Sequence, residues 1–279
     1  MVEDGEPVLA ERLKFPNAWI SNTPQKLEQM KLMTKLMLML ATAAVATAAS
    51  ATGTIPRTAE PSPNTIPQAV EWNQQCAARV AAFKGKPCDV IFIGDSITQN
   101  FIDPPHGGWN LVGHDIWEKY YGRRAVLNFG VGGDSTQNAL WRMDHMDIAG
   151  LHPKVAVVML GMNNQNDTPE DIARGVKAVI DKARAIFPGV KVVVMSVTAN
   201  GRMPGKTPQI NTLLTAFADG RDVFYVDLYS QMPSTSPNSW QGVGGDKVHL
   251  TKEGYEIWAS TLEPVLIKLG VPPAIQHSP

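Results

Sequence analysis

Short apolar runs alternate with longer amphipathic stretches from residue 68 onward. The runs are rich in β-branched and aromatic residues, a composition typical of buried strands. They predict strands at Val90–Ile93, Ala125–Phe129, Val155–Leu160, Lys191–Val197 and Asp222–Asp227. The remaining periodic stretches predict helices at Gln68–Phe83, Asp115–Tyr121, Thr136–Met143, Pro169–Phe187, Gln209–Ala218 and Thr251–Leu269. Two loops are expected, at Phe101–His114 and Ser230–Gly245.

The strict alternation of strands and helices determines the expected fold class. Parallel strands need crossover helices, and these helices bury both faces of the sheet. Right-handed crossovers then produce a doubly wound α/β domain, a three-layer α/β/α sandwich. Its central sheet would be parallel and five-stranded, with one strand for each apolar run.

The chain before the first predicted helix begins with two distinct pieces. Residues 1–29 have no periodic face and are treated as an N-terminal extension. Residues 30–51 carry lysines, an apolar run and a small-residue end, which are the three parts of a secretory signal peptide. The run is short for a membrane span. We therefore expect export, to the periplasm or outside the cell, from a start at Met30 and with no stable membrane span after cleavage. The alternative is an uncleaved anchor with a cytoplasmic tail.

Residues 52–67 differ in composition from the rest of the chain, because proline, serine, threonine and asparagine dominate the segment. Such a composition predicts an extended linker without a core of its own. The folded domain is therefore expected to span residues 68–279. A chain of 279 residues with 44% hydrophobic residues is long enough for one such domain with a sizeable core.

Charge and cysteine content exclude several classes of protein. The formal net charge is −1 and no long basic run is present, which argues against nucleic acid as the main partner. Two cysteines make neither a disulfide framework nor a four-cysteine zinc site. Cys76 and Cys88 either pair with each other in the exported protein or are two small buried residues. Their spacing leaves both possibilities open.

A serine stands at the carboxyl end of the first predicted strand, in the sequence Gly94-Asp95-Ser96. That edge of an open α/β sheet is where ligands bind. Serine and aspartate are also common helix-capping residues. These residues alone therefore leave open whether Ser96 is a helix cap or a nucleophile.

Three other segments favour the nucleophile. The second strand ends in a loop with Gly133 and the third in a loop with Asn163, so both loops meet Ser96 at one edge of a parallel sheet. Asp246 precedes His249 by three residues, just before the last helix. A nucleophilic serine needs a base, an acid that orients the base, and donors for an oxyanion. His249 and Asp246 supply the first two, while the donors are the backbone N–H groups of Ser96 and Gly133 and the Asn163 amide.

These segments resemble, in order, the four sequence blocks of the SGNH (GDSL) hydrolase superfamily, over roughly residues 89–266. The segments 128–134, 140–142 and 161–164 resemble the platelet-activating-factor acetylhydrolase-like branch. The resemblance implies a flavodoxin-like fold. It also implies ester hydrolysis through a serine acyl-enzyme, with Ser96, His249 and Asp246 as the triad and without a metal or other cofactor.

Residues beside these blocks are expected to support them. Asp95 and Asn164 are expected to shape the loops, and Asp134 to cap the helix after the second strand. Trp109 and Trp240 lie in the two loops expected to flank the site. Their rings either pack these loops down, or one of them forms a face for a sugar ring.

Other interpretations are weaker. A dinucleotide site at residues 130–135 fails the G-x-G-x-x-G pattern, because Ser135 holds its last place. A metal site made by Asp144, His145 and Asp147 is better explained as a solvated helix end. Two alternatives stay open: a catalytically inactive glycan-binding module and a lipase or lysophospholipase. An assay with p-nitrophenyl acetate and a serine-directed organophosphonate separates the first of these from an esterase.

We predict a serine esterase for short-chain esters, with acetyl groups preferred. The two loops expected to flank the site are rich in proline, glycine, serine and asparagine. Such loops do not wall a long apolar channel, which a long acyl chain needs to gain about 0.8 kcal/mol per buried CH₂. The expected substrates are small-molecule or polysaccharide esters, above all O-acetyl groups on carbohydrate. The oligomeric state does not follow from the sequence.

Overall fold

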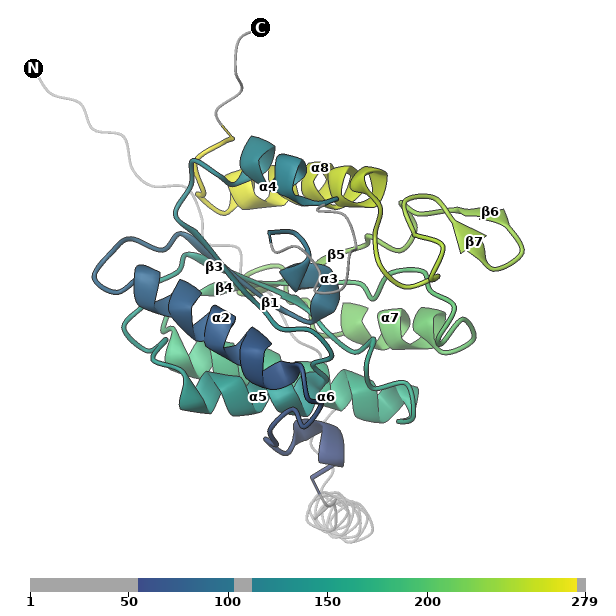
Figure 1. Cartoon of the computed structure of the whole chain (residues 1–279), viewed down its shortest axis with the longest axis horizontal. Coiled ribbons are helices and arrows are strands. Elements are labelled where there is room, and N and C mark those ends of the chain that lie inside the picture. The colour runs from purple at the N-terminus through teal and green to yellow at the C-terminus, as the bar shows by residue number, and fades with distance from the viewer. Residues whose placement is uncertain (1–54, 103–111, 275–279) are drawn as a thin grey trace, which may run out of the picture. The chain divides into compact units, whose positions relative to one another are not determined.

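The computed structural model describes residues 55–102 and 112–274. The predicted extension and signal peptide, residues 1–29 and 30–51, lie outside the described residues. Five parallel strands form one sheet in the order β2-β1-β3-β4-β5 (Figure 1). They span Val90–Gly94 (β1), Val126–Gly130 (β2), Val155–Met159 (β3), Lys191–Met195 (β4) and Val223–Val226 (β5). This order confirms the expected flavodoxin-like α/β fold.

Helices cover both faces of this sheet. They span Ala69–Ala82 (α2), Ser96–Gln99 (α3), His114–Tyr120 (α4), Thr136–His145 (α5), Pro169–Ile186 (α6), Thr207–Thr215 (α7) and Lys252–Lys268 (α8). Figure 1 shows α4 and α8 on one face and α5, α6 and α7 on the other. In the described ranges, no helix has the length and apolar character needed to cross a bilayer.

The sheet is buried where it carries the candidate chemistry. Every residue of β1, β2 and β3 is buried, as expected for parallel strands with both faces covered. Phe92 of β1 lies 5.2 Å from Tyr121 and 5.6 Å from Trp117, measured between ring centroids. Tyr255 of α8 donates a hydrogen bond of 2.8 Å to the carbonyl of Ile97, which joins α8 to α3 directly behind Ser96.

The strand order places a topological switch point next to Ser96. From β1 the chain goes to β2 on one side, and then crosses to β3 on the other side of β1. Ligands of open α/β sheets bind in the crevice outside the carboxyl ends of the strands at such a point. The loops after β1, β2 and β3 are those that carry Ser96, Gly133 and Asn163.

The segment predicted as a linker packs against the domain instead. Residues 57–59 form a 3-10 helix (η1, Arg57–Ala59), and Thr58 is fully buried. The Thr58 hydroxyl donates a hydrogen bond of 2.6 Å to the carbonyl of Asp171, and the Thr136 hydroxyl donates one of 2.7 Å to the carbonyl of Thr58. The compact unit therefore begins at Ile55 and not near residue 68. We call residues 55–66 the N-terminal strap.

Two further expectations concern short segments. The predicted loop 230–245 contains a small antiparallel pair, Ser234–Ser236 (β6) and Ser239–Trp240 (β7). Cys76 and Cys88 are both free and buried, so they are two small buried residues and do not pair with each other.

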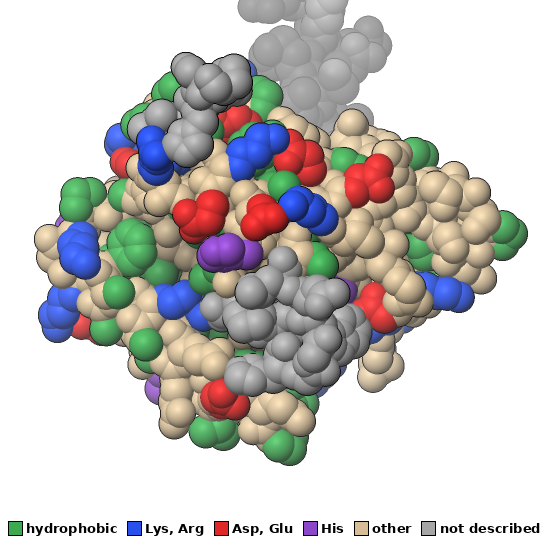
Figure 2. Space-filling model, turned by 45° about the horizontal axis from the view of Figure 1, so that its top comes forward, with side chains coloured by type: hydrophobic (Ala, Val, Ile, Leu, Met, Phe, Trp, Pro, Cys, Tyr) green, Lys and Arg blue, Asp and Glu red, His purple; other side chains and the backbone are tan. Residues whose placement is uncertain are grey.

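Acidic and basic side chains are interspersed over the face shown in Figure 2 and gather into no large patch of one sign.

Candidate active site

Ser96, His249 and Asp246 form a hydrogen-bonded chain. Ser96 Oγ lies 2.9 Å from Nε2 of His249, and Nδ1 of the same imidazole lies 2.5 Å from Oδ2 of Asp246. With the Nδ1 proton held by Asp246, Nε2 is the acceptor for the hydroxyl proton of Ser96. This arrangement of nucleophile, base and orienting acid suits acyl transfer.

The turn after β1 presents Ser96 as the first residue of α3. Asp95 caps the helix, because its carboxylate accepts a hydrogen bond of 2.9 Å from the backbone N–H of Ile97. The cap is thus Asp95, and the Ser96 side chain is left to contact His249. A Cβ atom at Gly94 would lie 1.9 Å from Oγ1 of Thr98, so this tight turn requires glycine.

The loop before α8 holds the Asp246 carboxylate in place. Its Oδ1 atom accepts hydrogen bonds of 3.0 Å from the backbone N–H groups of Val248 and His249, while Oδ2 contacts the imidazole. Partial burial raises the pKa of Asp246, but these hydrogen bonds outweigh it and hold the pKa below its ordinary value. The carboxylate is therefore charged when an imidazolium forms beside it.

The three expected oxyanion donors come from three different loops. Within the described ranges, no hydrogen bond uses the backbone N–H of Ser96 or of Gly133, which has φ +72°. The Asn163 amide donates through Nδ2 to the carbonyl of Asp134 at 2.9 Å, which places it beside Gly133. Arg202 donates to Oδ1 of Asn163 at 2.7 Å and fixes the orientation of the amide. An amide NH₂ group has two N–H donors, and the contact with Asp134 uses one of them.

Buried amides hold the loops that carry these donors. Oε1 of Gln99 accepts a hydrogen bond of 2.6 Å from the N–H of Gly132. Oδ1 of Asn164 accepts one of 3.0 Å from the N–H of Thr136, and its Nδ2 donates to Asp167 at 3.1 Å. Asn164 thus ties the Asn163 loop to the start of α5.

The expected role of Asp134 as a helix cap is wrong. Ser135 caps α5, together with Asn138 in a capping box. Asp134 is fully buried, and its Oδ2 accepts a hydrogen bond of 2.6 Å from Nε of Arg142, which is also buried. The Arg142 guanidinium lies 4.2 Å from the centroid of the Phe129 ring. Asp134 is therefore half of a buried ion pair beneath the Gly133 loop.

Asp95 is a buried carboxyl next to the nucleophile. Only 1% of the residue is exposed, and burial raises its pKa to about 7, with Asp134 adding repulsion and Arg202 opposing the shift. It lines a small pocket whose other walls are Ile97, Met159, Leu160, Met162, Val197 and Thr198. Near neutral pH this carboxyl is therefore partly protonated.

The remaining candidates are the two loop tryptophans and the three residues weighed as a metal site. Trp240 is half-buried on β7, and Trp109 lies outside the described residues. The three residues weighed as a metal site have other partners: Asp144 pairs with Lys182, Asp147 with Lys84, and His145 stacks on Trp141. Arg142 stands in a segment that carried the family resemblance, whereas no motif of the sequence marks Gln99 or Arg202.

Several known proteins are similar to this chain in sequence or in fold. A profile of the GDSL-like lipase/acylhydrolase family matches residues 92–257. The alpha1 subunit of rat platelet-activating factor acetylhydrolase IB is 30% identical over 195 residues, which covers 68% of this chain and 80% of the relative. The human alpha2 subunit is 32% identical over 163 residues, covering 54% and 67%. A proposed acylhydrolase from Bacteroides fragilis shares the fold with a TM-score of 0.56 and 21% identity, covering 71% of this chain and 97% of that one.

Proposed function

Because the chain belongs to the GDSL-like lipase/acylhydrolase family, it is an ester hydrolase, and we propose that it removes short acyl groups, above all acetyl, through a Ser96–His249–Asp246 triad. The observation that carries this proposal is the continuous hydrogen-bonded chain from Ser96 Oγ through the imidazole to the Asp246 carboxylate. It joins residues 153 positions apart in the sequence, at the switch point of the sheet.

In the proposed mechanism, Ser96 Oγ attacks the ester carbonyl while Nε2 of His249 takes the hydroxyl proton. The tetrahedral intermediate collapses as the same nitrogen returns that proton to the departing alcohol. Water then attacks the acyl-enzyme with His249 again as base, which releases the acid and restores Ser96. Asp246 holds the imidazole in the required tautomer and stabilises its cation.

Charge on the carbonyl oxygen develops in front of the proposed oxyanion donors. The proposed donors are the N–H groups of Ser96 and Gly133 and the amide of Asn163. They belong to three loops that internal hydrogen bonds hold in place before substrate arrives. Such donors lower the barrier because they need no reorganisation when the charge appears. Arg202, on Oδ1 of Asn163, polarises the amide and so makes its N–H groups stronger donors.

Two observations support acetyl as the preferred acyl group. The curated relatives at 30–32% identity carry the name acetylhydrolase. The loop from 230 to 245, beside the triad loop, is built from small and polar residues with a short hairpin. For the alcohol side we propose carbohydrate O-acetyl esters, with the half-buried ring of Trp240 as a face for a sugar. The rat and human relatives are named for platelet-activating factor, so a lipid ester is the competing outcome.

The test is a series of p-nitrophenyl esters from acetate to decanoate, followed by acetate release from acetylated xylan and from platelet-activating factor. We expect kcat/KM to be highest for acetate and to fall with chain length. Ser96→Ala and His249→Ala should each lower kcat by about 10³-fold or more. Asn163→Ala should lower kcat by about 10²–10³-fold, the usual loss of one oxyanion donor.

Each part of the proposal has its own contrary result. A kcat/KM that rises with acyl-chain length toward decanoate would contradict the acetyl preference and support the lipase alternative. Near-normal turnover by His249→Ala would remove the imidazole from its role as base. The absence of p-nitrophenyl acetate hydrolysis by the wild-type protein would indicate an inactive binding module. Hydrolysis that a serine-directed organophosphonate does not inhibit would remove Ser96 from its role as nucleophile.

A further inference from the structure

The N-terminal strap reaches the loop that carries the proposed Gly133 donor. Nδ2 of Asn64 donates hydrogen bonds of 3.1 Å to the carbonyl of Gly132 and of 2.9 Å to Oδ1 of Asp134. Oδ1 of the same amide accepts a hydrogen bond of 3.2 Å from the backbone N–H of Ile66. Both ends of the Asn64 amide are therefore engaged, and its orientation is fixed.

The carbonyl that Asn64 holds belongs to the same peptide unit as the Gly133 N–H. This unit is planar and trans, so its C=O and N–H point in opposite directions. Fixing the direction of the Gly132 carbonyl therefore fixes the direction of the Gly133 N–H. The constraint matters here because a peptide between two glycines rotates more easily than any other. A hydrogen bond to the carbonyl also makes the N–H at the other end a stronger donor.

Ile66 adds a second contact from the strap to the same peptide. A Cβ atom at Gly133 would lie 2.5 Å from Cδ1 of Ile66, so the isoleucine side chain covers the open face of this glycine. Ile66 itself is 38% exposed, which leaves it at the surface beside the proposed donor.

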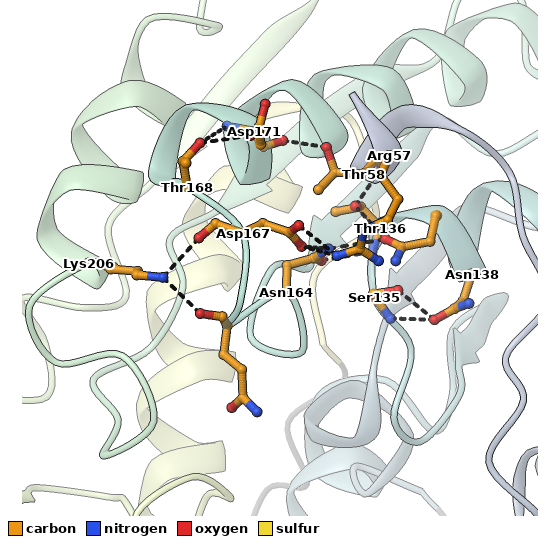
Figure 3. A network of polar contacts seen from close by, with 12 residues as sticks. Arg57, Thr58, Ser135, Thr136, Asn138, Asn164, Asp167, Thr168, Asp171 and Lys206 are labelled. Carbon is orange, nitrogen blue, oxygen red and sulfur yellow. Dashed lines mark hydrogen bonds and ion pairs between the residues drawn. The ribbon is translucent and has the colours of Figure 1, made fainter. Parts of the chain in front are cut away.

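The strap is anchored along its length, so Asn64 is not a loose contact. The N–H of Ser62 donates to the carbonyl of Gln137 at 3.1 Å, and its carbonyl accepts from Asn138 at 2.9 Å. At the other end, one guanidinium nitrogen of Arg57 donates to both carboxylate oxygens of Asp167, at 2.6 and 2.7 Å (Figure 3). The anchoring involves both α5 and the loop that begins at Gly161.

We propose that Asn64 of the strap is a positioning residue, which aims the Gly133 N–H at the oxyanion by holding the Gly132–Gly133 peptide. The inference rests on the proposed function, because the role of Gly133 as a donor belongs to it. It assigns a role in the reaction to a segment that precedes residues 92–257, the part matched by the family profile.

The test compares Asn64→Ala with Ser62→Ala in the full chain. Ser62 is a matched control because its anchoring contacts come from backbone atoms, which the substitution keeps. With p-nitrophenyl acetate, Asn64→Ala should lower kcat about 10-fold, as expected for a misplaced group, while KM changes less than about twofold. The Ki for phenylboronic acid, which forms a tetrahedral adduct on serine, should rise by the same factor as kcat/KM falls. Ser62→Ala should match the wild type in all three constants.

A merely structural role predicts a different pattern. Loss of folded enzyme lowers the number of serines titrated by a fluorophosphonate, but it leaves the kcat per titrated site and the Ki unchanged. That pattern, or an Asn64→Ala variant as active as Ser62→Ala, overturns the role of Asn64. If the wild type does not hydrolyse the ester, or if Ser96→Ala retains its activity, the proposed function fails and this inference fails with it.

Discussion

Asp95 is a buried carboxyl one residue before the nucleophile, and burial raises its pKa to about 7. Its carboxylate accepts the capping hydrogen bond from the N–H of Ile97. In the unfolded chain the same group has a pKa near 3.8. Between these two values the folded protein binds a proton that the unfolded chain has lost. The stabilising contribution of Asp95 is therefore complete below about pH 4 and disappears as the pH rises toward 7.

Asp95→Asn should remove this part of the pH dependence. Asparagine still accepts the capping hydrogen bond but has no proton to lose. The free energy of unfolding of the variant relative to wild type should therefore rise between pH 4.5 and pH 7.5, by a few kcal/mol in order of magnitude. Urea denaturation at several pH values measures it, with Asp181→Asn on the exposed face of α6 as the control. A difference that does not change with pH would contradict the raised pKa.

At the level of residues, the proposed catalytic groups are easier to identify from the sequence than the residues that hold those groups in position. Ser96, Asn163 and His249 each follow a strand or precede a helix in a pattern with a chemical reason. Asn64 and Arg202 act through hydrogen bonds to the donor loops. Asn64 reaches Gly132 from 68 positions away, and Arg202 reaches Asn163 from 39. These contacts form only when the chain is folded, so no local sequence pattern predicts them.

Helix α5 is joined to the sheet by a charged pair in the core. The Arg142 guanidinium is 1% exposed and the Asp134 carboxylate is fully buried, with 2.6 Å between Nε and Oδ2. The guanidinium also lies within 3.5 Å of the Gly94 carbonyl at the end of β1. Removing one member leaves the other charge buried without its partner, which typically costs about 3–5 kcal/mol.

Arg142→Met and Asp134→Asn should therefore each lower the free energy of unfolding by about 3–5 kcal/mol. The double variant should be more stable than the sum of the two losses implies, because it leaves no unpaired charge. Urea denaturation of the four proteins, read as a double-mutant cycle, gives the coupling energy. Strictly additive losses would show that the two side chains do not depend on each other.

Elements with a periodic apolar face were predictable, and elements held by polar contacts were not. The observed strand and helix bounds are close to those predicted from the sequence. The near-continuous apolar runs of the strands and the apolar face of α6 are stable only when they are buried. The N-terminal strap has no such face. The buried Thr58 donates from its hydroxyl to the Asp171 carbonyl, and its own carbonyl accepts a hydrogen bond from the Thr136 hydroxyl. These bonds satisfy the polar groups of a segment whose composition alone predicts exposure to solvent.

At the scale of the whole molecule, the strap limits the positions at which a signal peptide can be cleaved without loss of contacts to the site. Arg57 and Thr58 anchor its first residues, so cleavage inside residues 55–66 would remove contacts to the loops of the site. The predicted signal peptide ends at Ala51, before the strap begins. A cut after Ala51 therefore leaves the whole strap on the domain, whereas a mature chain that starts at Gln68, the expected edge of the domain, lacks Asn64.

We predict export with cleavage after Ala51 and a mature chain that begins at Thr52, because residues 30–51 combine lysines, an apolar run and a small-residue end. N-terminal sequencing of the protein from its natural host, outside the cytoplasm, checks the position. Purified chains starting at Thr52 and at Gln68 then test its consequence: the first should have full kcat per titrated serine and the second a reduced one. An intact Met1 in the membrane fraction would favour an uncleaved anchor, and equal turnover by the two chains would show that the strap does not contribute to the reaction.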